Sequence, residues 1–185
     1  TLLEIYNDKY FNGNEYDDYI NDKAGIQDNF WQRLKYILKF KNNLPVNSIL
    51  EIGCAYGFFA DLLAQKLSGP FHYQGFDASK EAINYAKLQY PDLTFNDEDY
   101  LSSSSLKKYS DVFMWDVIEH LSEPEKFIEK ISHEIVDNGF IYITTGNIKS
   151  MNARIWGRKW RLIHPPSHLY YFSEKILQII LIFCY

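Results

Sequence analysis

Glycines and a carboxylate follow two consecutive predicted strands, at positions where an α/β protein can bind a nucleotide. The first strand, residues 48–52, runs into Gly53-Cys54-Ala55-Tyr56-Gly57. Its two glycines permit a tight turn and a close approach of the backbone to a ligand. Asp77 follows the second strand, where an acidic side chain can accept both hydroxyls of a ribose. Two structural alternatives stay open: the glycines can serve a plain strand–helix turn, and Asp77 can cap the next helix.

The next two predicted strands also end in polar residues. Asn96-Asp97-Glu98-Asp99 follows the third strand. A carboxylate in this run could accept a hydrogen bond from an adenine amino group, and a solvated acidic loop fits the composition equally well. The fourth strand runs into Trp115-Asp116-Val117-Ile118-Glu119-His120-Leu121. The Gly-x-x-x-Gly spacing after the first strand matches neither the dinucleotide motif nor the phosphate-binding loop, which argues against a Rossmann oxidoreductase.

Two histidines are the candidate general bases. His120 and His168 are favoured because an imidazole titrates near neutrality. A structural histidine that holds a loop is the alternative for His120. Asp116 and Glu119 could also join both histidines in a divalent metal site, since carboxylates and imidazoles make a reasonable ligand set. The favoured interpretation contains no metal.

Strands and helices alternate along the chain and should position these residues. The apolar patterns predict strands at residues 48–52, 72–76, 93–95, 111–115 and 140–144, and helices at 26–40, 57–66, 80–89, 122–135 and from 173 onward. Ser122 and Glu125 resemble a capping box at the start of the fourth helix. The order predicts a Rossmann-like α/β fold, a doubly wound and mostly parallel sheet with helices on both faces. Ligands bind such sheets at the carboxyl ends of the strands.

Composition limits the class of protein. The chain has 185 residues, of which 46% are hydrophobic and 23% charged, as expected for one globular domain rather than a disordered chain. A net charge of −5 makes nucleic acid an unlikely partner. No apolar run is long enough to span a bilayer, so no membrane partner is expected. Cys54 and Cys184 cannot build a disulfide framework, and a cytoplasmic location is the default.

The charge is unevenly distributed. Residues 138–173 contain no Asp or Glu but hold five bases: Lys149, Arg154, Arg158, Lys159 and Arg161. Trp156 and Trp160 lie among them. A solvated loop that balances an acidic body is one interpretation, and a patch that attracts an anionic ligand such as a sugar nucleotide is the other.

Together, the segments between residues 49 and 147 resemble the class I S-adenosylmethionine-dependent methyltransferases. Residues 50–57 are close to the first-strand motif of that family, with Ala55 where Gly is common, and residues 116–121 are similar to its fourth-strand motif. Asn138-Gly139-Phe140 stands where a Gly-Gly turn is usual, and Thr145-Gly146-Asn147 where Thr-Pro-Asn is common.

A second stretch narrows the resemblance to a subgroup. Residues 160–173 are similar to a segment of small-molecule methyltransferases, including ubiquinone-type O-methyltransferases and enzymes of sugar or cell-surface glycan pathways. The pattern His-Leu-x-x-Phe-Ser matches His168, Leu169, Phe172 and Ser173. Lys9-Tyr10-Phe11 resembles the lid region of this subgroup. A Glu-x-x-Glu-His motif with a distant His, similar to residues 116–120 except for Asp116, binds metal in small-RNA 2′-O-methyltransferases.

The resemblance implies S-adenosylmethionine as the cofactor and gives each strand-end residue a role. Glu51, Gly53 and Ala55 would frame its methionine part, and Asp77 would hold the ribose hydroxyls. Ala78 would lie beside the adenine, Asp97 and Glu98 would reach the adenine edge, and Trp115 would lie beneath the cofactor. The full set expected to bind the cofactor is Glu51, Gly53, Cys54, Ala55, Tyr56, Gly57, Asp77, Ala78, Asp97, Glu98, Trp115 and Asp116. The expected catalytic residues are His120 and His168.

The expected function is therefore methyl transfer to a small-molecule acceptor, as O-methylation of an anionic or sugar-like substrate. A catalytically inactive cofactor-binding or scaffold module of the same fold is the main alternative. A metal-dependent RNA 2′-O-methyltransferase is a weaker one. Tyr10, Trp156, Trp160, Tyr170 and Tyr171 are expected near an acceptor pocket and its lid.

Residues 1–185 are expected to form one methyltransferase-like domain. Residues 1–45 would be an N-terminal lid and helical segment, 46–147 the cofactor-binding core, 148–172 an acceptor-side insertion and 173–185 the last helix. The resembled family has two further strands, which form a hairpin after this helix. Their absence would expose a sheet edge, so a homodimer or an unstable monomer is expected.

Overall fold

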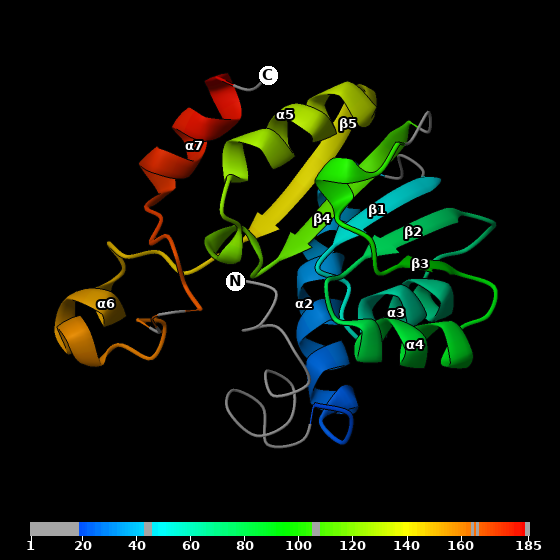
Figure 1. Ribbon diagram of the computed structural model, residues 1–185, viewed down its shortest axis with the longest axis horizontal. Helices are drawn as coiled ribbons and strands as arrows, with labels where there is room; N and C mark the ends of the chain where they lie inside the picture. Colours follow the sequence, from blue (N-terminus) through cyan, green and yellow to red (C-terminus); the bar gives the residue numbers. More distant parts are fainter. Residues whose placement is uncertain (1–18, 43–45, 105–107, 164, 166, 184–185) are drawn as a thin grey trace. The chain divides into compact units, whose positions relative to one another are not determined.

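The sheet is built from five strands. The computed structural model describes residues 19–42, 46–104, 108–163, 165 and 167–183 (Figure 1). The strands are β1 (Ser48–Ile52), β2 (His72–Phe76), β3 (Thr94–Asn96), β4 (Tyr109–Trp115) and β5 (Ile135–Thr144), and their order in the sheet is β3-β2-β1-β4-β5. The chain divides into two compact units, residues 1–103 and 104–185. The alternating elements and parallel pairing confirm the predicted Rossmann-like α/β fold.

Among its described residues, the first unit holds three parallel strands, three α-helices and one short 3₁₀-helix. β1 pairs with β2 from Ser48↔His72 to Ile52↔Phe76, and β2 pairs with β3 from Gln74↔Thr94 to Phe76↔Asn96. The helices are α2 (Lys23–Lys41), α3 (Phe58–Lys66) and α4 (Lys80–Gln89). Because the strands are parallel and in register, their carboxyl ends lie at one edge of this part of the sheet.

Aromatic packing closes the unit around the start of α3. Ala55, Tyr56, Phe58 and Ala82 form a buried cluster, against which Tyr19, Ile26, Phe30 and Tyr85 pack. Polar contacts join α2 to the first turn of α3. Gln27 Nε2 donates to Phe58 O at 2.9 Å, and Lys23 Nζ lies 2.7 Å from Asp61 Oδ2. The turn after β1 and the start of α3 are therefore held by aromatic packing and by polar contacts with α2.

The second unit is built on the β4–β5 pair. The strands are parallel, with Asp111↔Phe140 to Trp115↔Thr144 in register. The other elements are η3 (Ile118–His120), α5 (Pro124–Glu134), α6 (Met151–Trp156), η4 (Gly157–Lys159) and α7 (Glu174–Phe183). α7 begins one residue after the predicted Ser173. The hairpin and dimer expectations stay predictions.

Two local expectations about this unit are wrong, and one helix was not expected. Pro124 takes the first position of α5, so Glu123 is the cap residue, and no side chain caps the helix. The predicted Ser122–Glu125 box is out of register by one residue. β5 begins at Ile135 rather than Phe140, because the pairing with β4 is irregular between Tyr109 and Asp111 and Asn138 takes a positive φ of 60°. The helix α6 was not predicted at all.

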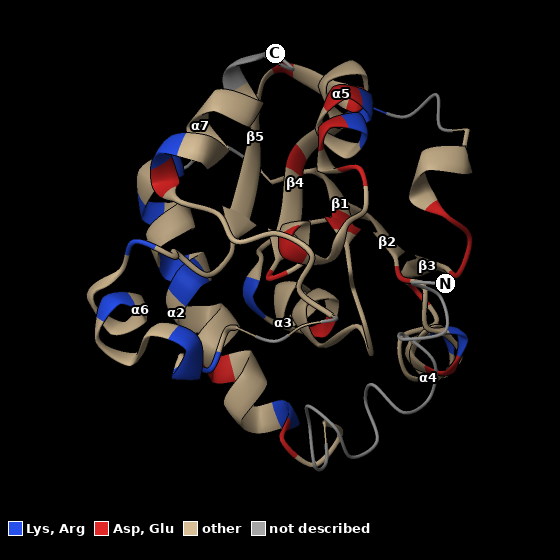
Figure 2. Cartoon of the chain, turned by 60° about the vertical axis from the view of Figure 1, so that its left-hand side comes forward, with Lys and Arg blue, Asp and Glu red and all other residues tan. Residues whose placement is uncertain are grey.

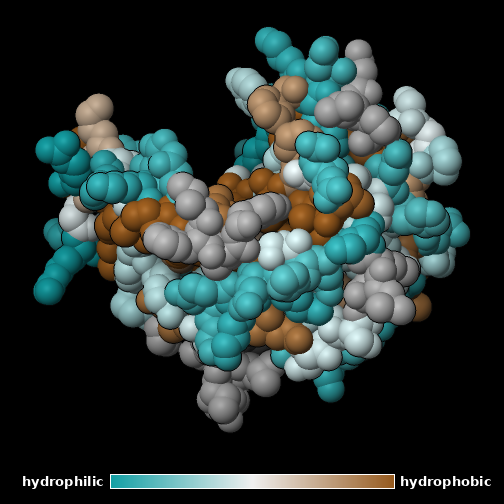
Figure 3. All heavy atoms as spheres, turned by 90° about the horizontal axis from the view of Figure 1, so that it is seen from above, coloured by the Kyte–Doolittle hydropathy of each residue, from teal (hydrophilic) through white to brown (hydrophobic). Residues whose placement is uncertain are grey.

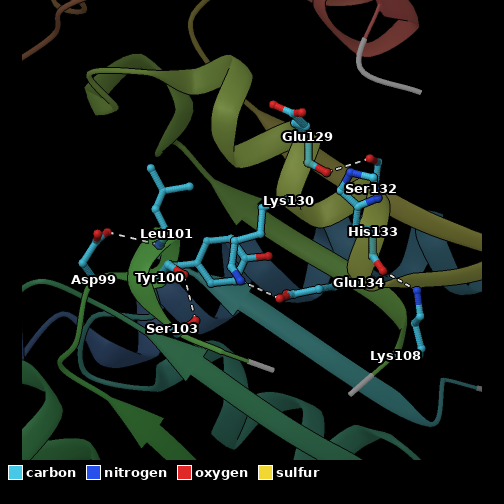
Figure 4. A network of polar contacts seen from close by, with 10 residues as sticks. All are labelled: Asp99, Tyr100, Leu101, Ser103, Lys108, Glu129, Lys130, Ser132, His133 and Glu134. Carbon is cyan, nitrogen blue, oxygen red and sulfur yellow. Dashed lines mark hydrogen bonds and ion pairs between the residues drawn. The ribbon is translucent and has the colours of Figure 1, made fainter. Parts of the chain in front are cut away.

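Polar contacts secure the ends of short elements in each unit (Figure 4). Near the end of α5, Lys130 Nζ lies 2.6 Å from Glu134 Oε1, and Lys108 Nζ donates to the carbonyl of His133. In the first unit, Asp99 caps the short helix η2 (Tyr100–Ser102) by accepting from Leu101 N at 3.2 Å. Asp99 therefore has a structural role in the acidic run after β3.

Hydrophobic side chains also reach the surface, among hydrophilic ones, in the view of Figure 3. Within the described ranges, no helix combines the length and the apolar character that crossing a membrane requires.

Candidate functional site

The turn after β1 adopts a backbone that favours glycine. Gly53, Ala55 and Gly57 have φ angles of 77°, 44° and 75°. The amides of Gly53 and Cys54 both donate to Phe76 O, at 2.8 and 3.1 Å, which pins the turn to the end of β2. A Cβ at Gly57 would lie 2.9 Å from the Phe95 ring. Both the positive φ angle and the close approach of Phe95 therefore favour glycine at position 57. Ala55 adopts a left-handed conformation that costs a non-glycine residue about 1–2 kcal/mol.

Asp77 joins this turn to the start of α4. Its Oδ2 accepts from Ala55 N at 2.8 Å, and its Oδ1 accepts from Ser79 N at 2.8 Å. The helix cap is Ser79, whose Oγ accepts from Ala82 N. Burial raises the pKa of Asp77, and the two amide hydrogen bonds lower it. Since a carboxylate oxygen has two lone pairs, each oxygen can accept one further hydroxyl.

A buried acid lies behind the turn. Glu51 is 2% exposed, and Tyr73 donates its hydroxyl to Glu51 Oε2 at 2.5 Å. Burial raises the pKa of Glu51 to about 8, the bond from Tyr73 lowers it, and the charge of Asp77 raises it. Glu51 is therefore mostly protonated at neutral pH. Burial also raises the pKa of the Cys54 thiol.

The other predicted cofactor residues of this unit differ in position. The Tyr56 ring packs in the aromatic cluster, 5.5 Å from the Tyr19 ring and 5.2 Å from the Tyr85 ring. Ala78 is exposed beside Asp77. Asp97 and Glu98 are exposed after β3, and Asp97 Oδ1 lies 3.8 Å from Lys87 Nζ.

The end of β3 meets the end of β2. The amide of Asp77 donates to Asn96 O at 3.1 Å. Asp97, the first acidic residue after β3, directly follows this contact. The structure thus brings the β1 turn, Asp77 and the start of the acidic run to one edge, as the sequence predicts. Their roles toward a cofactor stay predictions.

In the second unit, the predicted residues Trp115 and Asp116 lie at the end of β4. Trp115 is buried, with 8% of its surface exposed, and its ring lies 5.5 Å from that of Phe113. Asp116 is exposed and has a positive φ of 54°. Its amide donates to Thr144 O and Oγ1, both at 3.0 Å, so the turn after β4 is tied to the end of β5.

Glu119 is a buried carboxyl in the next turn. It is 4% exposed, and its Oε2 has no hydrogen-bond partner among the described residues. Burial raises the pKa of Glu119 to about 7; its own backbone amide and Thr145 lower it, and the charge of Asp116 raises it. Its carbonyl accepts from Leu169 N at 2.8 Å and Tyr170 N at 3.2 Å. This turn therefore anchors the segment that carries His168.

The two predicted catalytic histidines meet at that anchor. Their ring centroids are 4.5 Å apart, in an edge-to-face arrangement. His120 Nδ1 lies 2.8 Å from Ser167 O, and His168 Nδ1 lies 2.9 Å from Leu162 O. A carbonyl can only accept, so Nδ1 carries the proton in both rings and Nε2 carries the lone pair of each neutral imidazole. Both rings are thus oriented to present a basic Nε2.

A small pocket opens beside this group. Its empty volume is about 170 Å³, part of which is open to solvent. It is lined by Glu119, Thr145, Gly146, Trp160, Leu162, His168, Tyr170 and Tyr171. The predicted aromatic residues Trp160, Tyr170 and Tyr171 are therefore brought together. Trp156 is not among the lining residues, and Tyr10 lies outside the described residues.

The same group could accept a proton or a cation. Ligand atoms of Glu119, His120 and His168 all lie within 4.8 Å of one another. Asp116, the fourth residue of the predicted metal set, does not belong to this group of described residues.

The sequence placed Glu119 in the alternative metal site but not among the residues expected to bind the cofactor or transfer a proton. The burial of Glu119 depends on the returning segment at residues 167–172, which no local pattern shows.

Comparison with known proteins gives one family match. A family model described as "Methyltransferase domain" matches residues 25–181. A probable (S)-tetrahydroprotoberberine N-methyltransferase from Papaver bracteatum is 27% identical over 110 residues, which cover 57% of this chain and 30% of that protein. A ubiquinone biosynthesis O-methyltransferase from Nitrosomonas europaea is 25% identical over 149 residues, which cover 75% of this chain and 62% of that protein. The chain thus spans less than two thirds of either relative.

Solved structures share the fold. A magnesium protoporphyrin IX methyltransferase from Synechocystis, crystallised with bound SAH, superposes with a TM-score of 0.69. The match covers 99% of this chain and 87% of that one at 18% sequence identity. At this identity the likeness concerns the fold alone.

Proposed function

The chain belongs to the methyltransferase domain family, and on that premise we propose that it transfers a methyl group from S-adenosylmethionine to a small-molecule acceptor. The observation that carries the proposal is Asp77, whose two oxygens accept from Ala55 N and Ser79 N and each retain a lone pair toward a ligand. Relatives named as methyltransferases and a fold neighbour with bound SAH support the choice of cofactor.

The residues of the first unit fit this cofactor. The positive-φ turn at Gly53, Ala55 and Gly57 brings backbone rather than side chains toward a ligand after β1. Asp77 is the proposed acceptor for the ribose hydroxyls, and Asp97 and Glu98 are exposed for the adenine edge. The protonated Glu51 supports the turn from behind without adding a negative charge. Tyr56 contributes through its backbone, since its ring is packed away.

The bound cofactor supplies an activated methyl group on a sulfonium, so the protein mainly aligns the acceptor and removes its proton. The pocket at Trp160, Tyr170 and Tyr171 suits a flat acceptor that stacks on aromatic rings. None of the five bases of residues 138–173 is among the lining residues, and a buried carboxyl is. We therefore propose a planar acceptor with a neutral hydroxyl, rather than the anionic acceptor expected from the sequence.

His168 is the proposed general base for O-methylation. It lines the pocket, and its Nδ1 is held by Leu162 O, which leaves Nε2 as the basic nitrogen. When the cofactor supplies its methyl group to an acceptor hydroxyl, Nε2 would take the proton of that hydroxyl. Glu119 then stabilises the imidazolium by its negative charge once it is ionised. His120 is a positioning residue, because it packs against His168 and holds Ser167 O.

A divalent cation is the alternative occupant of Glu119, His120 and His168. Dialysis of the whole protein against a chelator separates the two roles. Activity that survives dialysis assigns proton transfer to His168. Activity that is lost and then restored by Mg²⁺ or Mn²⁺ assigns the three side chains to a metal.

Calorimetry tests the cofactor site. We expect SAH to bind the intact chain, and Asp77→Ala to weaken binding at least tenfold, about 1.4 kcal/mol, because charge-assisted hydrogen bonds are lost. Asp92→Ala is the control, since Asp92 is exposed and lies after α4 in the same unit. Circular dichroism shows whether either variant is unfolded. Absence of binding by the intact chain contradicts the proposal, and binding without turnover on any acceptor favours a non-catalytic module.

A further inference from the structure

The short helix α6 exposes large apolar side chains. Met151 is 73% exposed, Ile155 is 69% exposed and Trp156 is 60% exposed. Met151 and Ile155 are four residues apart, so they share one face of the helix. The helix is well anchored, because Ser150 caps it by accepting from Ala153 N and Ala153 is buried. The exposure therefore belongs to an ordered element and needs an explanation.

Positive charge surrounds these side chains. Arg154 on α6 and Arg158 and Lys159 on η4 are exposed, and Figure 2 shows blue but no red along this stretch of the chain. The 36 residues from 138 to 173 hold five Lys and Arg and no Asp or Glu, whereas the other 149 residues hold 24 acidic and 14 basic ones. The segment is thus a basic region on an acidic chain. We call residues 149–161 the α6–η4 segment.

The acceptor pocket does not account for this segment. Trp160 lines the pocket, but Trp156, Met151 and the exposed bases are not among the residues that line it. A ligand in the pocket would leave the apolar face of α6 in water. The proposed acceptor site therefore does not explain the exposure of this face.

We propose that the α6–η4 segment docks the protein onto an anionic membrane surface. Helices that lie in a membrane interface combine apolar and aromatic side chains with Lys and Arg, as this segment does. Trp156 suits the headgroup level, where tryptophan is enriched, and Arg154, Arg158 and Lys159 would attract acidic lipids. The aliphatic Met151 and Ile155 favour a lipid over a nucleic acid, because a polyanion offers them no apolar phase.

Docking of this kind takes place at the surface of a bilayer and does not require a segment that spans it. No membrane partner was expected from the sequence, because that expectation depended only on the lack of apolar runs long enough to span a bilayer. Interfacial docking depends on exposed side chains of a short helix, and their exposure becomes known only from the structure. The docking does not depend on the proposed methyl transfer.

Co-sedimentation with lipid vesicles tests the proposal. The intact chain should bind vesicles of phosphatidylcholine with 30% phosphatidylglycerol and should not bind pure phosphatidylcholine. Binding should weaken as salt is raised, since it depends on charge. Emission of Trp156 should shift to the blue on binding, and this shift should be absent in Trp156→Phe.

Two variants separate the apolar and the electrostatic contributions. Arg154→Gln with Arg158→Gln should weaken binding about thirtyfold, from about 1 kcal/mol for each charge. Ile155→Ser with Trp156→Ser should weaken it at least tenfold by removing the apolar face. Leu88→Ser is the control, because Leu88 is 79% exposed on α4 in the other unit and should leave binding unchanged.

Three results would overturn the proposal. They are failure of the intact chain to bind acidic vesicles, equal loss of binding in Leu88→Ser, and tight binding of an RNA oligonucleotide without binding of vesicles. The second result would show that any exposed apolar residue matters. The third would assign the segment to nucleic acid. Circular dichroism of each variant confirms that the comparison is made between folded proteins.

Discussion

The carboxyl of Glu119 and the imidazole of His168 line one pocket. The pKa of Glu119 is about 7, so this residue is neutral in mild acid and charged in mild base. A charged Glu119 stabilises the protonated form of a nearby imidazole, whereas a neutral one does not. The pair therefore makes the proposed proton transfer depend on pH near neutrality.

We predict that kcat/KM rises as pH increases through about 7 and falls as pH decreases through it. Glu119→Gln should remove this contribution and lower kcat about tenfold to a hundredfold, because the imidazolium loses its counter-charge. His168→Ala should lower kcat further. The pH–rate profile of each variant is the measurement, and a Glu119→Gln profile that matches the unmodified protein would refute the role given to Glu119.

Glu51 predicts a pH-dependent stability. Its pKa is about 8 in the folded chain and near 4.5 in the unfolded chain. Between these values the unfolded state loses the proton while the folded state keeps it, so its contribution to stability is full below about pH 4.5 and is lost as pH rises to about 8. The slope of this loss is about 1.4 kcal/mol per pH unit.

Urea unfolding measured from pH 5 to pH 8 checks this expectation. Glu51→Gln keeps the shape and a hydrogen-bonding group but cannot ionise, so it should flatten the pH dependence. Glu98→Gln is the control, since Glu98 is exposed after β3. Equal slopes for Glu51→Gln and the unmodified protein would contradict the raised pKa.

Residue-level patterns predicted the turn and Asp77, and they gave Glu119 only as a possible metal ligand, not as a buried carboxyl of the pocket. Asp77 follows a buried strand and precedes a helix, so its place at the strand end can be deduced from local order. Glu119 becomes a pocket residue only because the distant segment at 167–172 bonds to its carbonyl. That contact depends on tertiary packing, which the local sequence does not record.

At the scale of elements, the β1–α3 turn depends on a glycine that cannot be replaced cheaply. Gly57 has a φ of 75°, and a Cβ there would lie 2.9 Å from the Phe95 ring. We expect Gly57→Ala to destabilise the chain by about 2–4 kcal/mol, from backbone strain and overpacking together.

Gly25→Ala is the matched control for this prediction. Gly25 lies within α2, and a Cβ there would meet nothing within 4 Å. Because alanine is the better helix former, this change should stabilise the chain by up to about 1 kcal/mol. Thermal unfolding of both variants is the measurement, and equal effects of the two substitutions would contradict the packing argument.

Several strands and helices could be predicted because their apolar patterns are strong. The strands at residues 48–52 and 72–76 and the helix at residues 80–89 were predicted with their observed limits. The start of α5 was misplaced because Pro124 sets the cap at Glu123. α6 was missed because a six-residue helix with its apolar side chains facing solvent has no buried periodic face.

At the scale of the molecule, the two units carry different features of the proposed function. The first unit holds the turn after β1 and Asp77, which suit a nucleoside ligand. The second holds an aromatic pocket with a buried acid and two oriented histidines. The family match spans most of both units, from residue 25 to residue 181. The order of strands and helices predicted the fold class and local composition predicted the charge asymmetry, but the pocket depended on how the segment that carries Trp160 and His168 folds back.

The central claim is that the edge formed by β1, β2 and β3 binds S-adenosylmethionine through Asp77. A crystal structure of the protein grown with SAH tests it most directly. We expect both ribose hydroxyls to lie within about 3.2 Å of the Asp77 carboxylate oxygens and the turn at residues 53–57 to contact the ligand. SAH ordered elsewhere on the chain, with Asp77 bonded only to Ala55 and Ser79, would refute the proposed site.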